Sequence, residues 1–98
     1  MDNKRNITII KELAETFKPK HRGIIDAGEV SYVRNVIKFE NFKTELDLRN
    51  LRDMIVIYFS LKEEREELEA HQIFDLMDTM SAIVGVIDGE LYNRGYEV

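Results

Sequence analysis

The fold of this chain is constrained most by three signals for the start of an α-helix. Each signal is followed by apolar residues at helical spacing. Asp26, Thr44 and Ser60 can each cap a helix, and an acidic residue follows each of them three positions later. Such pairs satisfy N–H groups that the first turn of a helix leaves free. We therefore expect helices to begin near these three residues.

Apolar residues follow these signals with the period of an amphipathic helix. The stripes consist of Val30, Val33, Val36 and Ile37; of Leu48, Leu51, Ile55, Tyr58 and Phe59; and of Leu76, Met80, Ile83, Val84, Ile87 and Leu91. A further stripe, from Ile7 to Phe17, ends before Pro19, and Gly95 suits the end of the last helix. The pattern predicts a mainly α fold with three shorter helices and one long C-terminal helix over about residues 64–93.

Two segments also have features of β-strands. Residues 30–40 are rich in β-branched side chains, and residues 54–59 form a continuous apolar run that a buried strand would share. Asp88 and Gly89 would suit a hairpin turn between short strands. The alternative is an α+β fold with strands near 30–40 and 53–61. Because residues 54–59 are apolar on all sides, we expect them to be central in either fold.

Length and composition predict that residues 1–98 form a single domain. Hydrophobic residues make up 44% of the chain, which is enough for a core and argues against wholesale disorder. The absence of cysteine excludes disulfides, thiolate zinc sites and cysteine nucleophiles. The N-terminus lacks the apolar core of a signal peptide, and no apolar run approaches the roughly 20 residues of a membrane span. We expect a cytoplasmic protein with no membrane partner.

The net charge of −5 is distributed unevenly along the chain. Residues 1–44 carry nine basic and six acidic residues, whereas residues 45–98 carry five basic and thirteen acidic residues. The acidic residues gather in what we call the acidic segment, which comprises Glu63, Glu64, Glu66, Glu67, Glu69, Asp75 and Asp78. Such a run is commonly a solvated helix face, but it would also suit docking onto a basic protein surface, including a groove that normally holds nucleic acid.

Two further features concern assembly and metal binding. A helix over residues 64–93 would be about 45 Å long, which exceeds the roughly 30–35 Å diameter of a compact domain of this size, so a homodimer through this helix is a second expectation. Ser81, Gly85 and Gly89 share one lane of that helix, which would permit close helix approach. The same helix would align Glu67, His71, Asp75 and Asp78, and carboxylates with an imidazole suit Zn, Mn or Fe. One alternative function is therefore a metal-dependent hydrolase that takes further acids from a second chain.

The connector after the first helix carries the clearest cationic cluster, Lys18, Lys20 and Arg22. These residues are anion-binding candidates, and they define another alternative, a weak nucleic-acid binder. Cations also gather after a helix C-terminus because the helix dipole favours them there, and a pI near 5.0 argues against nucleic acid.

The sequence contains no serine-nucleophile elbow and no glycine-rich phosphate loop. We therefore predict no catalytic residue, no metal site and no cofactor. The expected function is that of a small, acidic, non-enzymatic protein that binds another protein as a regulator or inhibitor through the acidic segment. Tyr92 and Tyr96 would add contact anchors.

Overall fold

The computed structural model describes residues 3–21 and 24–97, which form four α-helices. Helix α1 spans Asn3–Thr16, α2 spans Ala27–Ile37, α3 spans Glu45–Arg65 and α4 spans Ala70–Asn93, and the short 3-10 helix η1 covers Phe39–Asn41. The mainly α prediction is therefore confirmed. No strand occurs within the described residues, so the strands considered near 30–40 and 53–61, and the hairpin at Asp88 and Gly89, are wrong.

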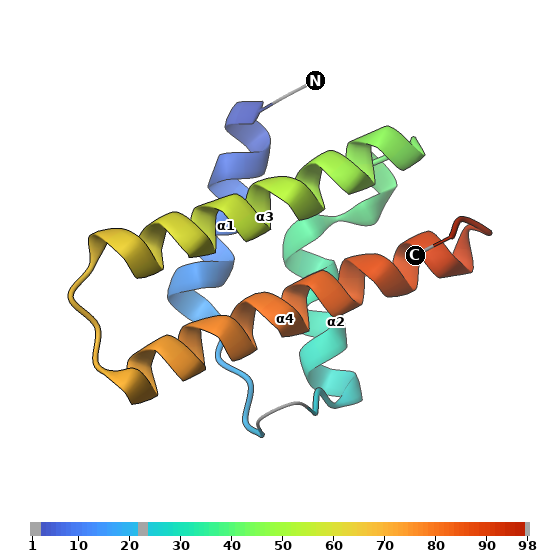
Figure 1. The fold of residues 1–98 in the computed structure, drawn as a ribbon. Helices are drawn as coiled ribbons and strands as arrows, with labels where there is room; N and C mark the ends of the chain where they lie inside the picture. The colour runs from blue at the N-terminus through green and yellow to red at the C-terminus, as the bar shows by residue number, and fades with distance from the viewer. Residues whose placement is uncertain (1–2, 22–23, 98) are drawn as a thin grey trace.

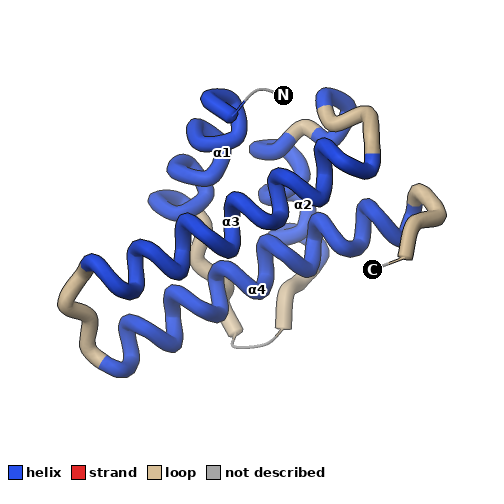
Figure 2. Tube along the Cα trace, turned by 45° about the horizontal axis from the view of Figure 1, so that its top comes forward, coloured by secondary structure: helices blue, strands red, loops and turns tan. Residues whose placement is uncertain are grey.

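The helices form two layers that cross each other (Figure 1). Helices α3 and α4 lie side by side and antiparallel in one layer, while α1 and α2 run across them in the other (Figure 2). Helix α1 packs on α3, and α2 packs on α4. In Figure 1 the α3–α4 layer faces the viewer, and no other described helix lies in front of it. We call this uncovered side the outer face.

The core lies between the two layers and takes one stripe from each helix. Its buried apolar side chains are Ile9, Ile10, Leu13, Phe17, Val33, Ile37, Phe39, Phe42, Leu48, Leu51, Ile55, Phe59, Ile83, Val86, Ile87 and Leu91. Full burial of one such side chain stabilises the fold by about 1.5–3 kcal/mol. The predicted stripes supply most of this core, although Ile7 remains 42% exposed.

Two of the predicted helix starts are confirmed by their capping hydrogen bonds. The backbone N–H of Glu29 donates to the Asp26 carboxylate at 2.8 Å, and the backbone N–H of Asp26 donates to the Glu29 carboxylate at 3.2 Å. Thr44 and Asp47 make the same reciprocal pair at the start of α3. Glu29 also accepts the backbone N–H of Lys20 at 3.0 Å. This capping group therefore holds the connector from α1 as well.

The predicted end of the last helix is also confirmed. Gly95 adopts a left-handed backbone conformation with φ of 89°, and its N–H donates to the Tyr92 carbonyl at 3.0 Å. The N–H of Tyr96 donates to the Leu91 carbonyl at 3.0 Å. These two bonds form a Schellman motif, in which glycine tolerates the positive φ.

The third predicted start is wrong, because Ser60 lies inside α3 and the chain breaks later, at residues 66–69. Acids near the C-terminus of α3 oppose its dipole, whereas Glu69 at the N-cap of α4 is favourable there. With 24 residues, α4 is about 36 Å long, and the longest dimension of the molecule is 38 Å. The helix is therefore shorter than the expected length of about 45 Å, and α3 packs antiparallel beside it, so the premise of the length argument for a homodimer is wrong.

Candidate partner-binding surface

The α3–α4 layer carries most of the exposed large hydrophobic side chains among the described residues. Nine large hydrophobic side chains are exposed among the described residues, and six of them belong to this layer: Leu46, Val56, Ile57, Leu61, Phe74 and Tyr92. Ile57 is 57% exposed and Phe74 is 56% exposed. Isolated exposed apolar residues are ordinary, but their concentration on one layer is typical of an interaction surface.

This exposure overturns the expectation that residues 54–59 are central on all sides. Ile55 and Phe59 point into the core, but Ile57 lies about 200° around the helix axis from Ile55. The side of α3 opposite the core therefore receives Ile57, and no described helix covers it. An apolar run that is buried on one side only leaves apolar surface available for another molecule.

Helix α4 has an exposed side of the same kind. Phe74, Ser81, Gly85 and Tyr92 are exposed and follow one another at spacings of seven, four and seven residues, so they share one side of the helix. Ile83, in the core, lies on the opposite side.

Contacts at the seam between α3 and α4 hold these two exposed sides together. Met77 and Val84 are half-buried and pack against the core cluster beside the exposed side of α4. The Arg52 guanidinium on α3 donates to the Asp88 carboxylate on α4 at 2.7 Å. This interhelical pair places residues near 52 level with those near 88. The buried sides of both helices meet the same second layer, so their opposite, exposed sides belong to one outer face.

The acidic segment is not a single helix face, as the sequence suggested, but an elbow at one end of the layer. Glu63 and Glu64 lie in the last turn of α3, and Glu66, Glu67 and Glu69 lie between the helices. Asp75 and Asp78 follow in the first turns of α4. The carboxylates of Glu64, Glu67 and Glu69 belong to exposed residues.

Local hydrogen bonds hold the elbow in place. The Lys62 ammonium donates to the Glu66 carboxylate at 2.8 Å, and this bond raises the pKa of Lys62 above its usual value of 10.5. The backbone N–H of Glu69 donates to the Gln72 side chain at 2.9 Å, which is half of a capping box at the start of α4. The elbow therefore presents its carboxylates from a defined turn.

The predicted row of Glu67, His71, Asp75 and Asp78 does not form along one helix, because Glu67 precedes α4. His71 instead contacts its neighbour Glu69, with 3.5 Å between the imidazole Nδ1 and the carboxylate. Among residues 3–21 and 24–97, no group of three or more His, Cys, Asp or Glu side chains is arranged to hold a metal ion.

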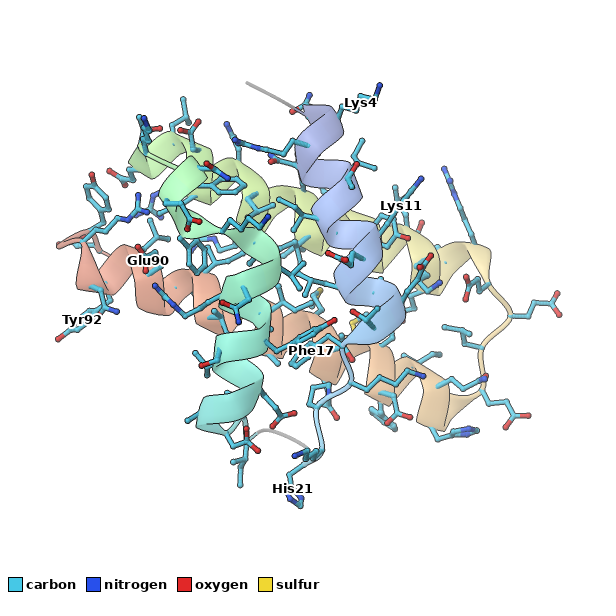
Figure 3. The ribbon with its side chains drawn as sticks, turned by 180° about the vertical axis from the view of Figure 1, so that it is seen from behind. Lys4, Lys11, Phe17, His21, Glu90 and Tyr92 are labelled. Carbon is cyan, nitrogen blue, oxygen red and sulfur yellow. The ribbon has the colours of Figure 1, made fainter. Side chains whose placement is uncertain are left out.

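Two sites that the sequence separates meet at one open cavity of about 600 Å³. Lys18 and Lys20 of the connector line it together with Glu66, Asp75 and Asp78 of the acidic segment. Figure 3 shows the connector leading from α1 past Phe17 to His21 at the edge of the molecule. Carboxylates beside the two lysines repel a phosphate, which weakens the case for anion binding there. Arg22, the third predicted anion-binding residue, lies outside the described residues.

The uneven charge of the sequence becomes a difference between the two layers. Residues 1–44, the part of the chain that includes α1, α2 and η1, carry a formal net charge of +3, and residues 45–98, the part that includes α3 and α4, carry −8. Figure 3 shows Lys4 and Lys11 on the α1 side of the molecule. Four of the five bases of the α3–α4 layer pair with its own carboxylates: Arg49 with Glu45, Arg52 with Asp88, Lys62 with Glu66 and Arg94 with Glu90. The charge that this layer offers to a partner is therefore negative.

The two predicted tyrosine anchors differ in exposure. Tyr92 projects from the end of α4 (Figure 3) and is 74% exposed. Tyr96 is half-buried and packs against the core, so the prediction that it is an exposed anchor is wrong. The Schellman motif turns the chain back at Gly95, and Tyr96 packs against the core.

Comparison with known proteins gives no match for this chain among family models, curated proteins or solved structures. Its fold and charge define a class of small protein with two crossed helix layers, a basic layer on one side and an acidic, partly apolar layer on the other. None of its described helices is long and apolar enough to span a membrane.

Proposed function

We propose that this chain is a non-enzymatic protein that binds another protein with a basic surface, and that it acts as a regulator or inhibitor of that partner. The observation that carries the proposal is the placement of the acidic segment at one end of the α3–α4 layer, while the cationic excess belongs to the other layer. Charge separated in this way orients a protein as it approaches an oppositely charged partner and raises the association rate.

The fit to a basic groove follows from the chemistry of the elbow. Grooves that bind nucleic acid present Lys and Arg side chains at the positions of successive phosphates. Glu64, Glu67 and Glu69 are three exposed acids within residues 64–69, and carboxylates can accept the same hydrogen bonds. An inhibitor of this kind needs placed carboxylates and a stable support, not catalytic groups.

The proposal is tested by reversing charge at the elbow. We expect the variant Glu63→Lys/Glu64→Lys/Glu67→Lys to lose the partners that wild type captures from the native cell. The matched control reverses Glu12, Glu15 and Glu40, three exposed acids of the basic layer, and should capture the same partners as wild type. Capture should also weaken as salt rises, because the screening length falls from about 10 Å at 0.1 M to about 3 Å at 1 M ionic strength. Equal capture by wild type and the elbow variant would refute the proposal.

A further inference from the structure

We infer that the outer face of the α3–α4 layer is the docking site of a basic amphipathic helix from a partner protein. The inference rests on the proposed function and deepens it by naming the element of the partner that is recognised. The carboxylates at the elbow would then be one edge of a longer surface whose centre is apolar.

The apolar centre has the spacing that helix recognition uses. Ile57 and Leu61 stand four residues apart on α3 and are both exposed, and Phe74 is exposed on the neighbouring helix. In helix recognition an amphipathic helix lays its apolar face against exposed apolar side chains, with its own anchors at spacings of three or four residues. A few well-packed side chains supply most of the binding energy at protein interfaces, and aromatic residues such as Phe74 are enriched there.

The middle of α4 carries small residues on the outer face. A Cβ atom added at Gly85 would meet no atom within 4 Å, so neither the packing of this chain nor backbone strain requires a glycine there. Ser81, one turn earlier, is exposed on the same side of α4. Small residues at these two positions let another helix approach α4 closely, as they do where helices pack in contact with one another.

Charge around the face selects a cationic helix rather than a second copy of this chain. Asp53 lies one turn before Ile57 on α3 and is exposed, and Glu64 lies one turn after Leu61. Arg52, which lies next to Asp53 in sequence, is bonded to Asp88 at the seam. Two outer faces pressed together would bring these carboxylates toward one another, whereas lysine or arginine flanking an apolar stripe would meet them with opposite charge.

The length of the face also matches a helix. Helix α3 has 21 residues, so it is about 32 Å long. A partner helix of five turns is about 27 Å long and would lie within it.

The test uses two synthetic peptides, each of about five helical turns, with the same leucine stripe at helical spacing and with either lysine or glutamate on its flanks. Binding is measured by fluorescence anisotropy and mapped by NMR amide shifts. We expect the lysine peptide to bind at micromolar concentration with shifts on α3 and α4, and the glutamate peptide to bind at least tenfold more weakly. Equal binding of the two peptides, no binding of either, or shifts confined to α1 and α2 would overturn the inference.

Variants separate the outer face from apolar surface in general. Ile57→Ser/Phe74→Ser and, separately, Gly85→Gln should each weaken lysine-peptide binding at least tenfold while circular dichroism shows an unchanged fold. The matched control is Ile7→Ser, which removes an exposed isoleucine from α1 and should bind like wild type. Unchanged binding by both outer-face variants would contradict the inference. A wild-type dimer in light scattering that Ile57→Ser/Phe74→Ser converts to a monomer would assign the face to a second copy instead.

The outcomes also distinguish this inference from the proposed function. If charge reversal at the elbow abolishes partner capture while Ile57→Ser/Phe74→Ser leaves capture and peptide binding intact, the proposed function stands and the helix-docking inference fails. If both sets of variants lose capture and Ile57→Ser/Phe74→Ser also loses lysine-peptide binding, both stand. If neither loses it, both fail.

Discussion

Replacing Ile55 and Ile57 by alanine, one at a time, should cost very different amounts of stability, although the two residues lie two positions apart in one apolar run. Ile55 is fully buried between the layers, and Ile57 is 57% exposed on the outer face. The pair therefore tests the feature on which the docking surface depends, namely that one side of α3 is uncovered.

The expected magnitudes follow from burial. Truncation of a buried isoleucine to alanine costs about 2–5 kcal/mol, because it removes transfer energy and leaves a cavity. Full burial of an isoleucine side chain is worth about 1.5–3 kcal/mol, and less than half of Ile57 is covered, so its truncation should cost about 1 kcal/mol or less. Alanine's higher helix propensity offsets up to about 0.7 kcal/mol of that loss. We expect Ile55→Ala to be less stable than Ile57→Ala by at least about 1 kcal/mol.

Urea unfolding followed by far-UV circular dichroism measures this difference. Both variants should keep the wild-type dependence of unfolding free energy on denaturant, since they expose similar surface on unfolding. For a domain of this size a loss of 1 kcal/mol lowers Tm by about 4–8 °C, so the two variants should be well separated in thermal melts too. If Ile57→Ala proves as destabilising as Ile55→Ala, the outer face is covered in solution and the reasoning fails.

Two other features of α4 give predictions of opposite sign. Gly85→Ala and Gly89→Ala should each raise the free energy of unfolding by about 0.5–1 kcal/mol, because both glycines lie inside the helix with open space at the Cβ position. Chemical denaturation measures this change. A lower free energy of unfolding for either variant would mean that the added methyl group meets another atom. At Glu90, burial raises the pKa, but hydrogen bonds from Arg94 and Arg34 outweigh it and hold the pKa below the usual 4.5. The pairing of Glu90 should therefore stabilise the fold by about 1.5–3 kcal/mol above pH 4.5, and this stabilisation should be lost as pH falls through the lowered pKa. Urea unfolding at a series of pH values measures the difference in stability between wild type and Glu90→Gln, which should narrow on acidification. A constant difference would show that the carboxylate's charge is not involved.

Local signals in the sequence determined the secondary structure of this protein. Asp26 and Thr44 start helices, and Gly95 ends one, because their hydrogen bonds join residues only a few positions apart. The apolar period likewise depends on local helix geometry, so the stripes identified most of the core. The charge imbalance between the two halves of the chain was also visible, although not its meaning in space.

The break at residues 66–69 was not predictable from the same signals, since it contains neither glycine nor proline. Ser60 and Glu63 have the spacing of a capping pair, but they lie inside α3. The helix runs through them, and its apolar stripe of Leu51, Ile55 and Phe59 is buried in the core. The turn forms because α3 and α4 bury their stripes against each other and against the second layer. That gain is a long-range term, and it overrides local propensity.

The sequence thus showed which residues make up the acidic segment. The tertiary structure decided which surface of the molecule these residues belong to. Because residues 54–59 are apolar on all sides, the sequence predicted that they are central, but the second layer covers only one side of α3 and leaves Ile57 exposed. It likewise separated Lys18 and Lys20 from Glu66, which line one cavity in the fold. Periodicity shows which residues share a side of a helix; which sides are covered depends on how the two layers cross, and that is determined by contacts between residues far apart in the chain.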